Sequence, residues 1–353
     1  MLAHRLALTL PPKLAHRLAV RALALGLPIA RRPMGGPLTL AAGLSFPNPL
    51  GLAAGFDKNG VAIAALARMG FGHVEIGTVT PRPQAGNPGP ALFRLKADRA
   101  IVNRLGMPGD GAEAVARRLS HWREANPDAR LRLGVSVGSN RDSTDIAADM
   151  AFGVSRFGPV ADYLAVNLSS PNTQGLRDWQ TGDRLAQVLD AVAAAHARLA
   201  RRPPLFVKLA PDMTAEDEAA LVDRAVAAGL AGLIVCNTTV ARPAGLRSPD
   251  AGRLGGLSGA PLTARALAQL RRIRSQAGGR LTLIASGGVM SAADALARLD
   301  AGAALVQVMT GWVYRGPSLV DEVLAALAPP SNAAASPDSP RSRGLPRLGL
   351  ARR

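Results

Sequence analysis

At 353 residues the chain is long enough for one barrel domain with added ends, and its 48% hydrophobic content is typical of a globular protein. A single cysteine, Cys236, excludes a disulfide framework and a thiolate zinc site within one chain. The formal charge is +17, but residues 1–56 supply +6 of it and residues 329–353 supply +4, and only 3% of residues are aromatic. Because the charge lies largely on the two ends and few side chains could stack on bases, we expect no nucleic-acid partner.

Residues 12–27 predict a short cationic helix. Pro12 suits a first helical position, and Lys13, Arg17 and Arg21 form a basic stripe beside several leucines. Such a helix can lie on a membrane surface or pack on its own domain with its arginines in solvent. No apolar run approaches the roughly 20 residues that cross a bilayer, so we expect contact with a membrane rather than a span. The acid-free, arginine-rich start also fits a mitochondrial presequence.

Strand and helix patterns alternate eight times from residue 50 onward. The strands read as nearly continuous apolar runs, as in a parallel sheet covered on both faces. We therefore predict an α/β fold, a (β/α)₈ TIM barrel with an N-terminal helical extension; an open doubly wound sheet is the alternative, although its Gly-x-Gly-x-x-Gly turn is absent. The predicted strands are Leu50–Ala54, Val74–Thr78, Leu131–Val137, Tyr163–Leu168, Leu205–Leu209, Gly232–Cys236, Leu281–Ala285 and Leu305–Met309. The predicted helices are 60–69, 111–124, 144–156, 183–201, 215–228, 262–277, 291–301 and 318–327.

Flanking segments complete the predicted organisation. Leu38–Phe46 reads as a hairpin that closes the bottom of the barrel, and the Pro-, Ser- and Arg-rich stretch from Pro329 is predicted to be disordered. We expect an extension at 1–36, a barrel at 37–328 and a basic tail at 329–353. Three helices begin with a capping-box pattern, namely Thr214 with Asp217, Ser291 with Asp294, and Ser318 with Asp321.

Polar and glycine residues follow the predicted strands, at the end where a barrel of this kind builds its active site. Only four of the 42 basic side chains are lysines, yet Lys58 and Lys208 both stand at strand ends, where a compact ammonium suits an anionic or electron-accepting atom. The turn Ser286-Gly287-Gly288, followed by Thr310-Gly311, has the layout of a phosphate site, although glycine turns also serve as plain connectors. The other polar strand-end residues are Thr78, Thr80, Ser136, Asn140, Asn167, Ser169, Ser170, Asn172, Asn237, Thr238 and Thr239.

Histidine is absent from the predicted strand ends. His4, His16, His73, His121 and His196 all lie elsewhere, so neither a Ser-His-Asp hydrolase nor a histidine-ligated metal is supported. We expect no metal, and instead an organic cofactor that performs a redox step itself.

Several long motifs, in order over about residues 10–328, closely resemble dihydroorotate dehydrogenase, class 2. They are Asn48–Lys58 (NPLGLAAGFDK), Glu75–Gln84 (EIGTVTPRPQ), Asn167–Thr173 (NLSSPNT), Val207–Asp212 (VKLAPD), Asn237–Thr239 (NTT) and Gly255–Leu262 (GGLSGAPL). In addition, Leu10–Leu18 (LPPKLAHRL) resembles the second helix of the class 2 extension, which forms a tunnel for membrane quinone.

The resemblance implies an FMN-dependent oxidoreductase that converts dihydroorotate to orotate in pyrimidine (UMP) biosynthesis and passes the electrons to membrane quinone. It implies that Ser170 is the general base, whereas class 1 enzymes place cysteine there. It implies a substrate site of Lys58, Asn103, Arg104, Leu105, Gly106, Met107, Asn167, Asn172, Asn237 and Thr238. It implies FMN contacts from Ala54, Gly55, Phe56, Asp57, Lys58, Thr78, Ser136, Asn167, Lys208, Cys236, Gly259, Gly288, Met309 and Thr310.

The expected setting is a monomer in peripheral contact with anionic lipid, on the cytoplasmic face of a bacterial inner membrane or, alternatively, on the mitochondrial inner membrane. The chain also departs from the family pattern at several positions. Ser136 stands where asparagine is usual, Ser139 where lysine is common, Met107-Pro108-Gly109 where Phe-Asn-Asn is usual, Cys236 where Thr or Ser is expected, and Met309 where Tyr is frequent.

Two other functions remain open from the sequence. An FMN-dependent tRNA dihydrouridine synthase is also a barrel, but it needs a catalytic cysteine on a loop, and Cys236 ends a predicted strand. A peripheral membrane-binding module with a vestigial barrel would instead bind no flavin.

Overall fold

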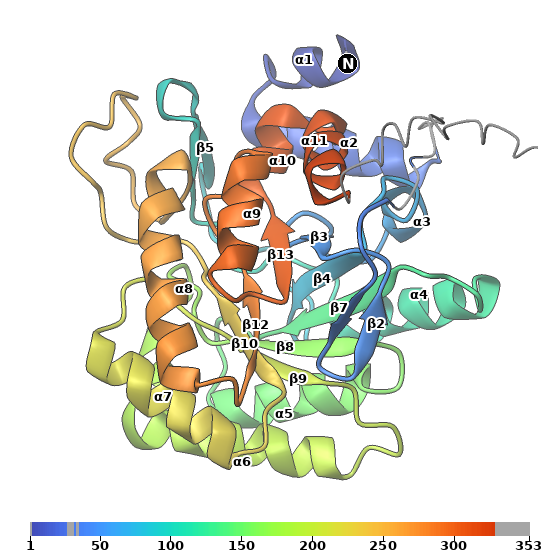
Figure 1. The fold of residues 1–353 in the computed structure, drawn as a ribbon, viewed down its shortest axis with the longest axis vertical. Coiled ribbons are helices and arrows are strands. Elements are labelled where there is room, and N and C mark those ends of the chain that lie inside the picture. The colour runs from blue at the N-terminus through green and yellow to red at the C-terminus, as the bar shows by residue number, and fades with distance from the viewer. Residues whose placement is uncertain (1, 27–31, 33–34, 329–353) are drawn as a thin grey trace, which may run out of the picture.

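Eight parallel strands close into a barrel in the computed structural model, which describes residues 2–26, 32 and 35–328 (Figure 1). The last strand pairs with the first, with Val308 opposite Leu52, so the predicted barrel is confirmed and the open-sheet alternative is wrong. Every predicted strand is present, and its ends differ by no more than two residues. In order around the barrel they are β3 (Leu50–Leu52), β4 (His73–Val79), β7 (Arg132–Val137), β8 (Tyr163–Asn167), β9 (Leu205–Lys208), β10 (Gly232–Val235), β12 (Thr282–Ala285) and β13 (Leu305–Val308).

Helices follow the strands and cover the outside of the barrel. They are α3 (Ile63–Leu66), α4 (Ala112–Ala125), α5 (Ile146–Phe157), α6 (Gly182–Ala197), α7 (Ala215–Ala227), α8 (Thr263–Ala277), α9 (Ala292–Asp300), α10 (Thr310–Arg315) and α11 (Pro317–Leu327), with short 3₁₀ turns η1 (Lys96–Asp98), η2 (Leu176–Gln180) and η3 (Ala260–Leu262). All eight predicted helices are present, whereas α10 was not predicted.

At two of the three predicted capping boxes, the first residue caps its helix. Thr214 and Ser291 accept hydrogen bonds from the N–H groups three residues later, at 3.1 and 3.2 Å. The third prediction is wrong because α11 begins at Pro317, so Ser318 lies inside the helix and donates to the carbonyl of Arg315.

Side chains alternate between two apolar layers along the strands, as the pleat requires. Val74 and Ile76 pack in the core between strands and helices, whereas Tyr163 and Phe206 belong to the cluster inside the barrel. The hairpin β1 (Thr39–Ala41) and β2 (Leu44–Phe46) adds Phe46 to the inner cluster, so the predicted closure of this end is confirmed. The opposite end, where the strands finish, is left for the site.

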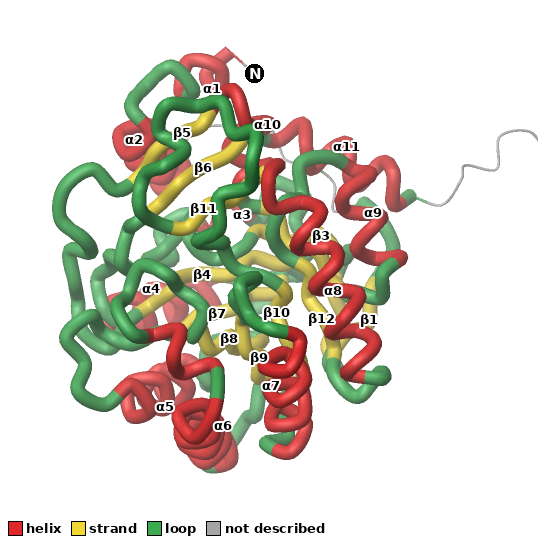
Figure 2. Tube along the Cα trace, turned by 90° about the vertical axis from the view of Figure 1, so that its left-hand side faces the viewer, coloured by secondary structure: helices red, strands yellow, loops and turns green. Residues whose placement is uncertain are grey.

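A three-stranded antiparallel sheet, which was not predicted, lies over the finishing ends of the strands. It consists of β5 (Leu92–Leu95), β6 (Ala100–Asn103) and β11 (Gly256–Gly259). Figure 2 shows this sheet between the barrel and the two N-terminal helices, α1 (Leu2–Ala7) and α2 (Pro12–Ala24). Arg94 of β5 holds the connection between those helices, because its Nη1 donates to the carbonyl of Leu8 at 2.7 Å.

The predicted cationic helix forms as α2, and its basic stripe of Lys13, Arg17 and Arg21 is exposed. Leu14 and Leu18 are exposed beside the stripe, although only Ala15 of this helix is fully buried. No helix among the described residues has the length and apolarity needed to cross a membrane. The tail predicted from Pro329 lies outside the described residues.

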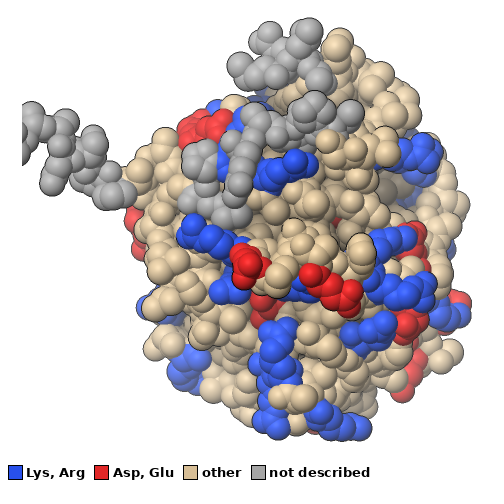
Figure 3. All heavy atoms as spheres, turned by 90° about the vertical axis from the view of Figure 1, so that its right-hand side faces the viewer, with Lys and Arg blue, Asp and Glu red and all other residues tan. Residues whose placement is uncertain are grey.

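Charged side chains are mixed on the face drawn in Figure 3. Lys and Arg are spread over that face with acidic side chains among them, rather than gathered in one stripe. The positive charge of this face is therefore distributed.

Candidate active site

One cavity of about 1940 Å³ occupies the end of the barrel where the strands finish. Ser170, Lys58 and Lys208 all line it, although they come from three different parts of the chain. The same cavity continues between the barrel and the N-terminal helices, where Leu6, Leu18 and other residues of α1 and α2 form its wall. A single space thus joins the strand ends to the helical extension.

Lys208 projects from the end of β9 into this cavity above a buried acid. Its side chain is 6% exposed, and its Nζ lies 3.8 Å from Oε1 of the fully buried Glu75. The other oxygen of Glu75 accepts hydrogen bonds from Tyr163 Oη at 3.2 Å and Gln307 Nε2 at 2.8 Å. The ion pair explains how a lysine and a glutamate can both be held inside the barrel.

Lys58 lies on the opposite side of the cavity. Its Nζ donates to the carbonyl of Gly55 at 2.6 Å. Burial lowers the pKa of Lys58 to about 8, although the neighbouring Asp57 carboxylate acts in the opposite direction. Burial, with a smaller effect from Lys58, also lowers the pKa of His16 on α2 to about 3. At pH 7 Lys58 is therefore mostly protonated and can bind an anion, whereas His16 beside it is neutral.

Asparagine amides from separate strand ends meet in the cavity. Asn167 Nδ2 donates to Thr78 Oγ1 at 2.7 Å, and Asn237 Nδ2 donates to Ser169 Oγ at 2.9 Å. Asn172 Nδ2 donates to Asn103 Oδ1 at 2.9 Å. In contrast, the buried atoms Asn172 Oδ1 and Thr238 Oγ1 have no hydrogen-bond partner among the described residues. Such unpaired buried atoms are costly unless a ligand satisfies them.

Ser170 lies on the loop after β8, and Arg177 ties this loop to its neighbour. Ser170 is 7% exposed, and its Oγ accepts from the Asn172 N–H at 3.3 Å. Arg177 donates to the carbonyl of Ser169 at 3.0 Å and to the carbonyl of Thr238 at 2.7 Å, and pairs with Asp212 at 2.7 Å. One guanidinium thus fixes the loop that carries Ser170 against the loop after β10.

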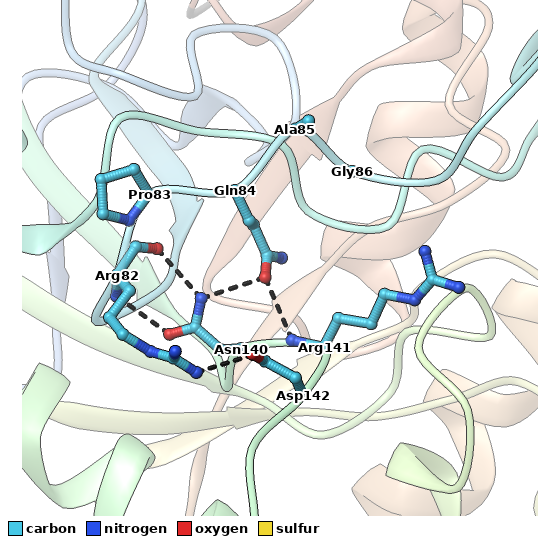
Figure 4. Close-up of a pocket in the computed structure, with 8 residues that line it drawn as sticks. All are labelled: Arg82, Pro83, Gln84, Ala85, Gly86, Asn140, Arg141 and Asp142. Carbon is cyan, nitrogen blue, oxygen red and sulfur yellow. Dashed lines mark hydrogen bonds and ion pairs between the residues drawn. The ribbon is translucent and has the colours of Figure 1, made fainter.

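The loop at 104–109 is held over the cavity by Gln84. Its Nε2 donates to the carbonyls of Gly106 and Met107, each at 3.0 Å. Figure 4 shows that the Gln84 oxygen turns the other way, toward Asn140 Nδ2 and the Arg141 N–H, both at 3.0 Å. The amide group therefore links the loop over the site to the end of β7.

Two glycines form the turn after β12. Gly287 and Gly288 line the cavity with φ angles of +86° and +67°, which favour glycine. A side-chain carbon on Gly288 would lie 2.4 Å from the Cα of Thr263, so the turn is pressed against the start of α8. Neither N–H of this pair donates to an acceptor among the described residues. Free N–H groups on a cavity wall are what an anion requires.

The structure brings nearly all predicted site residues to this cavity. Ala54, Gly55, Phe56, Asp57, Thr78, Asn167, Lys208, Cys236, Gly288, Met309 and Thr310 line it, as do Ser170, Lys58, Asn103, Leu105, Gly106, Met107, Asn172, Asn237 and Thr238. Ser136, Arg104 and Gly259 are not among its lining residues.

These three residues are held by contacts outside the lining. Ser136 is fully buried, and its short side chain reaches only Thr78 Oγ1, at 3.0 Å. Arg104 uses its backbone to hold the loop, because its carbonyl accepts from Asn87 Nδ2 at 2.9 Å. Gly259 ends β11, opposite Ala100.

The sequence did not identify several polar residues that also line the cavity. They include His16, Arg94, Gln307 and Tyr314. Gln307 faces inward from the middle of β13, which the strand period could have indicated. Arg94 and Tyr314 belong to β5 and α10, neither of which the sequence predicted.

Cys236 is a poor candidate for acid or nucleophile chemistry. It follows β10 and is 1% exposed, and burial raises the pKa of its thiol to about 12. This placement does not suit the mobile loop cysteine that a tRNA dihydrouridine synthase would need.

Comparison with known proteins gives a consistent result. The dihydroorotate dehydrogenase family model matches residues 38–329. The chain is 48% identical over 323 residues to the dihydroorotate dehydrogenase (quinone) of Rhodospirillum rubrum, covering 90% of this chain and 87% of the relative. It is 50% identical over 322 residues to the protein of the same name from Nocardioides sp., covering 87% and 90%. It is also similar to the crystal structure of DHODH from Eimeria tenella in complex with ferulenol, with a TM-score of 0.85, 40% identity and 90% coverage of both chains.

Proposed function

Because the chain belongs to the dihydroorotate dehydrogenase family, we infer that it is a flavin-dependent oxidoreductase that oxidises dihydroorotate to orotate in pyrimidine biosynthesis. Its quinone-dependent relatives indicate that a quinone is the final electron acceptor. The observation that carries this proposal most directly is that Ser170, Lys58 and Lys208 open into one cavity. A base, an anion-binding cation and a second cation at the barrel end are the parts that the reaction needs.

We propose that the flavin is FMN, held at the strand ends by the glycine turn and Lys208. The unpaired N–H groups of Gly287 and Gly288 suit its phosphate, and the volume of the cavity accommodates a flavin together with a substrate. When bound, the isoalloxazine ring accepts a hydride from the substrate. The ammonium of Lys208 lies where it can stabilise negative charge on that ring, and Glu75 holds it there.

Lys58 and the asparagine amides are proposed to bind dihydroorotate. The Lys58 ammonium pairs with the substrate carboxylate, whereas Asn172 Oδ1 and Thr238 Oγ1, which lack partners, suit the ring amides. Asn103, Asn167 and Asn237 complete the polar wall. These contacts orient the substrate so that its C5 faces Ser170.

Ser170 is proposed to take the proton from C5 while hydride leaves C6. A serine hydroxyl is a weak base, so it depends on position and on a relay that accepts its own proton. The Asn172 N–H on the Ser170 oxygen and the Arg177 bond to Ser169 fix that position. Because Ser170 is almost completely buried, bulk water has little access to this step.

The N-terminal helices are proposed to admit quinone from a membrane surface. The cavity continues beneath α1 and α2, and α2 combines exposed Leu14 and Leu18 with the exposed cations Lys13, Arg17 and Arg21. All of these except Leu14 also border the cavity, so its edge lies at this exposed side of the helix. An apolar and cationic face of this kind suits peripheral binding to anionic lipid. We therefore propose a peripheral location on the cytoplasmic face of a bacterial inner membrane.

Anaerobic mixing of the purified protein with dihydroorotate tests this function. We expect the flavin absorbance to bleach, and a quinone added afterward should restore it. Protein that is colourless and takes up no FMN would instead support a vestigial barrel. Flavin that is reoxidised by tRNA in a salt-sensitive complex, and not by quinone, would support a dihydrouridine synthase.

A further inference from the structure

A completely buried arginine stands directly behind the glycine turn. Arg298 of α9 is 1% exposed, and it has the largest fully buried side chain among the described residues. Its guanidinium forms no ion pair within 4.0 Å in the described part of the chain; instead it donates to the carbonyls of Gly287 at 2.7 Å, Asp294 at 2.8 Å and Thr263 at 3.3 Å. A buried cation without a bonded carboxylate is costly unless another anion offsets its charge.

Acidic groups near Arg298 are already engaged. The closest one along its own helix is Asp294, whose Oδ2 accepts from the Met290 N–H at 3.0 Å and from Ser291 Oγ at 2.8 Å. That carboxylate caps the start of α9 rather than binding the guanidinium. Burial lowers the pKa of Arg298, although Asp294 attracts the guanidinium at a distance. The described residues therefore supply a nearby negative charge but no bonded counter-ion.

The hydrogen bond to Gly287 orients the cavity wall. The carbonyl of Gly287 and the N–H of Gly288 belong to one trans peptide unit, in which the two groups point in opposite directions. Because Arg298 holds the carbonyl from outside, the N–H of Gly288 is turned toward the other side, where the cavity lies. Thr263 Oγ1 holds the next carbonyl, that of Gly288, at 2.7 Å and orients the following peptide in the same way.

We infer that Arg298 provides the counter-charge for the phosphate group of the flavin, through the peptide between Gly287 and Gly288. This inference rests on the flavin site proposed above and adds a residue that does not line the cavity. Arg298 acts as a positioning residue: it aims one N–H group at the phosphate and places a permanent positive charge behind it. A neutral side chain could hold the turn, but only a cation also balances a dianion in a buried site.

FMN and riboflavin separate these two roles because they differ only in the phosphate. Arg298→Gln keeps a hydrogen-bond donor and removes the charge, and the affinity of the full-length apoprotein for each flavin is measured by fluorescence titration. We expect FMN to bind roughly 10- to 100-fold more weakly to this variant, while its affinity for riboflavin stays within about twofold of wild type. Arg298→Lys, which keeps the charge, should retain most of the preference for FMN.

Arg272→Gln is the matched control. Arg272 on α8 binds the buried carboxylate of Glu218 at 2.9 Å, so its loss should lower stability without changing the preference for FMN over riboflavin. Equal losses for both flavins in Arg298→Gln, or no loss for FMN, would overturn the inference. If Arg298→Gln does not fold, the result for Arg298→Lys decides. An Arg298→Lys protein that binds FMN no more tightly than riboflavin would refute the role of the charge. Wild-type protein that binds neither flavin would refute the proposed site as a whole.

Discussion

The ionisation of Lys58 predicts how tightly the site binds a carboxylate at different pH values. Its pKa is lowered to about 8 by burial, against the opposing effect of Asp57. The ammonium form, which binds the anion, is populated below pH 8 and is lost as the pH rises through that value. At pH 9 only about a tenth of Lys58 is protonated, so the dissociation constant of orotate should be about tenfold higher than at pH 7.

Orotate titration of the oxidised protein, followed by the flavin spectrum from pH 6 to 9, measures this dependence without turnover. His16 and Asp57 are the ionisable neighbours. The pKa of His16 is about 3, whereas burial raises the pKa of Asp57 although the N–H groups of Val61 and Ala62 bind its carboxylate. A pH dependence that comes from Asp57 would persist when Lys58 is replaced by arginine. Lys58→Arg serves as the control, because a guanidinium stays charged throughout this range and the dependence should vanish. A dissociation constant that does not change up to pH 9 in the native protein would refute this role for Lys58.

Three further perturbations separate the parts of the site. Gly288→Ala places a carbon 2.4 Å from Thr263 Cα and should abolish flavin retention. Gly278→Ala is the control, because Gly278 also has a positive φ, +56°, but a carbon added there meets nothing within 4 Å, so this variant should keep its flavin. Equal flavin content in the two variants would contradict the role of close packing at Gly288. Arg177→Ala frees the Ser170 loop, so flavin reduction should slow by roughly 10- to 100-fold with FMN still bound; an unchanged stopped-flow rate would exclude this positioning role. Deletion of residues 1–34 should abolish liposome binding and turnover with long-chain quinone, while dihydroorotate still bleaches the flavin. Normal turnover with quinone in the truncated protein would mean that the extension has another role.

The barrel could be predicted because its signals are local. Strands buried on both faces read as apolar runs, so β8 and β9 were placed within one residue at each end. The sheet of β5, β6 and β11 has no such signal: Asn103 pairs with Gly256, more than 150 residues later in the chain, and this pairing depends on the closed barrel. Ser318 matched a cap pattern, but the structure begins that helix one residue earlier, at Pro317.

The site was predictable where topology alone decides. Parallel strands finish at the same end of a barrel, so Lys58, Asn167 and Lys208 had to approach one another. The burial of Ser136 behind Thr78 follows from the length of one side chain, and the position of Arg298 behind the glycine turn follows from the packing of α9 on the start of α8. Neither could be read from the sequence pattern, because both depend on contacts between distant segments.

Single-turnover flavin reduction by Ser170→Ala protein tests the central claim most directly. The variant should purify with its flavin, since Ser170 makes no contact that shapes the glycine turn, but anaerobic dihydroorotate should bleach it roughly 10²- to 10⁴-fold more slowly than wild type. Bleaching at the wild-type rate in flavin-loaded variant protein would show that Ser170 is not the base, and would contradict the site proposed here.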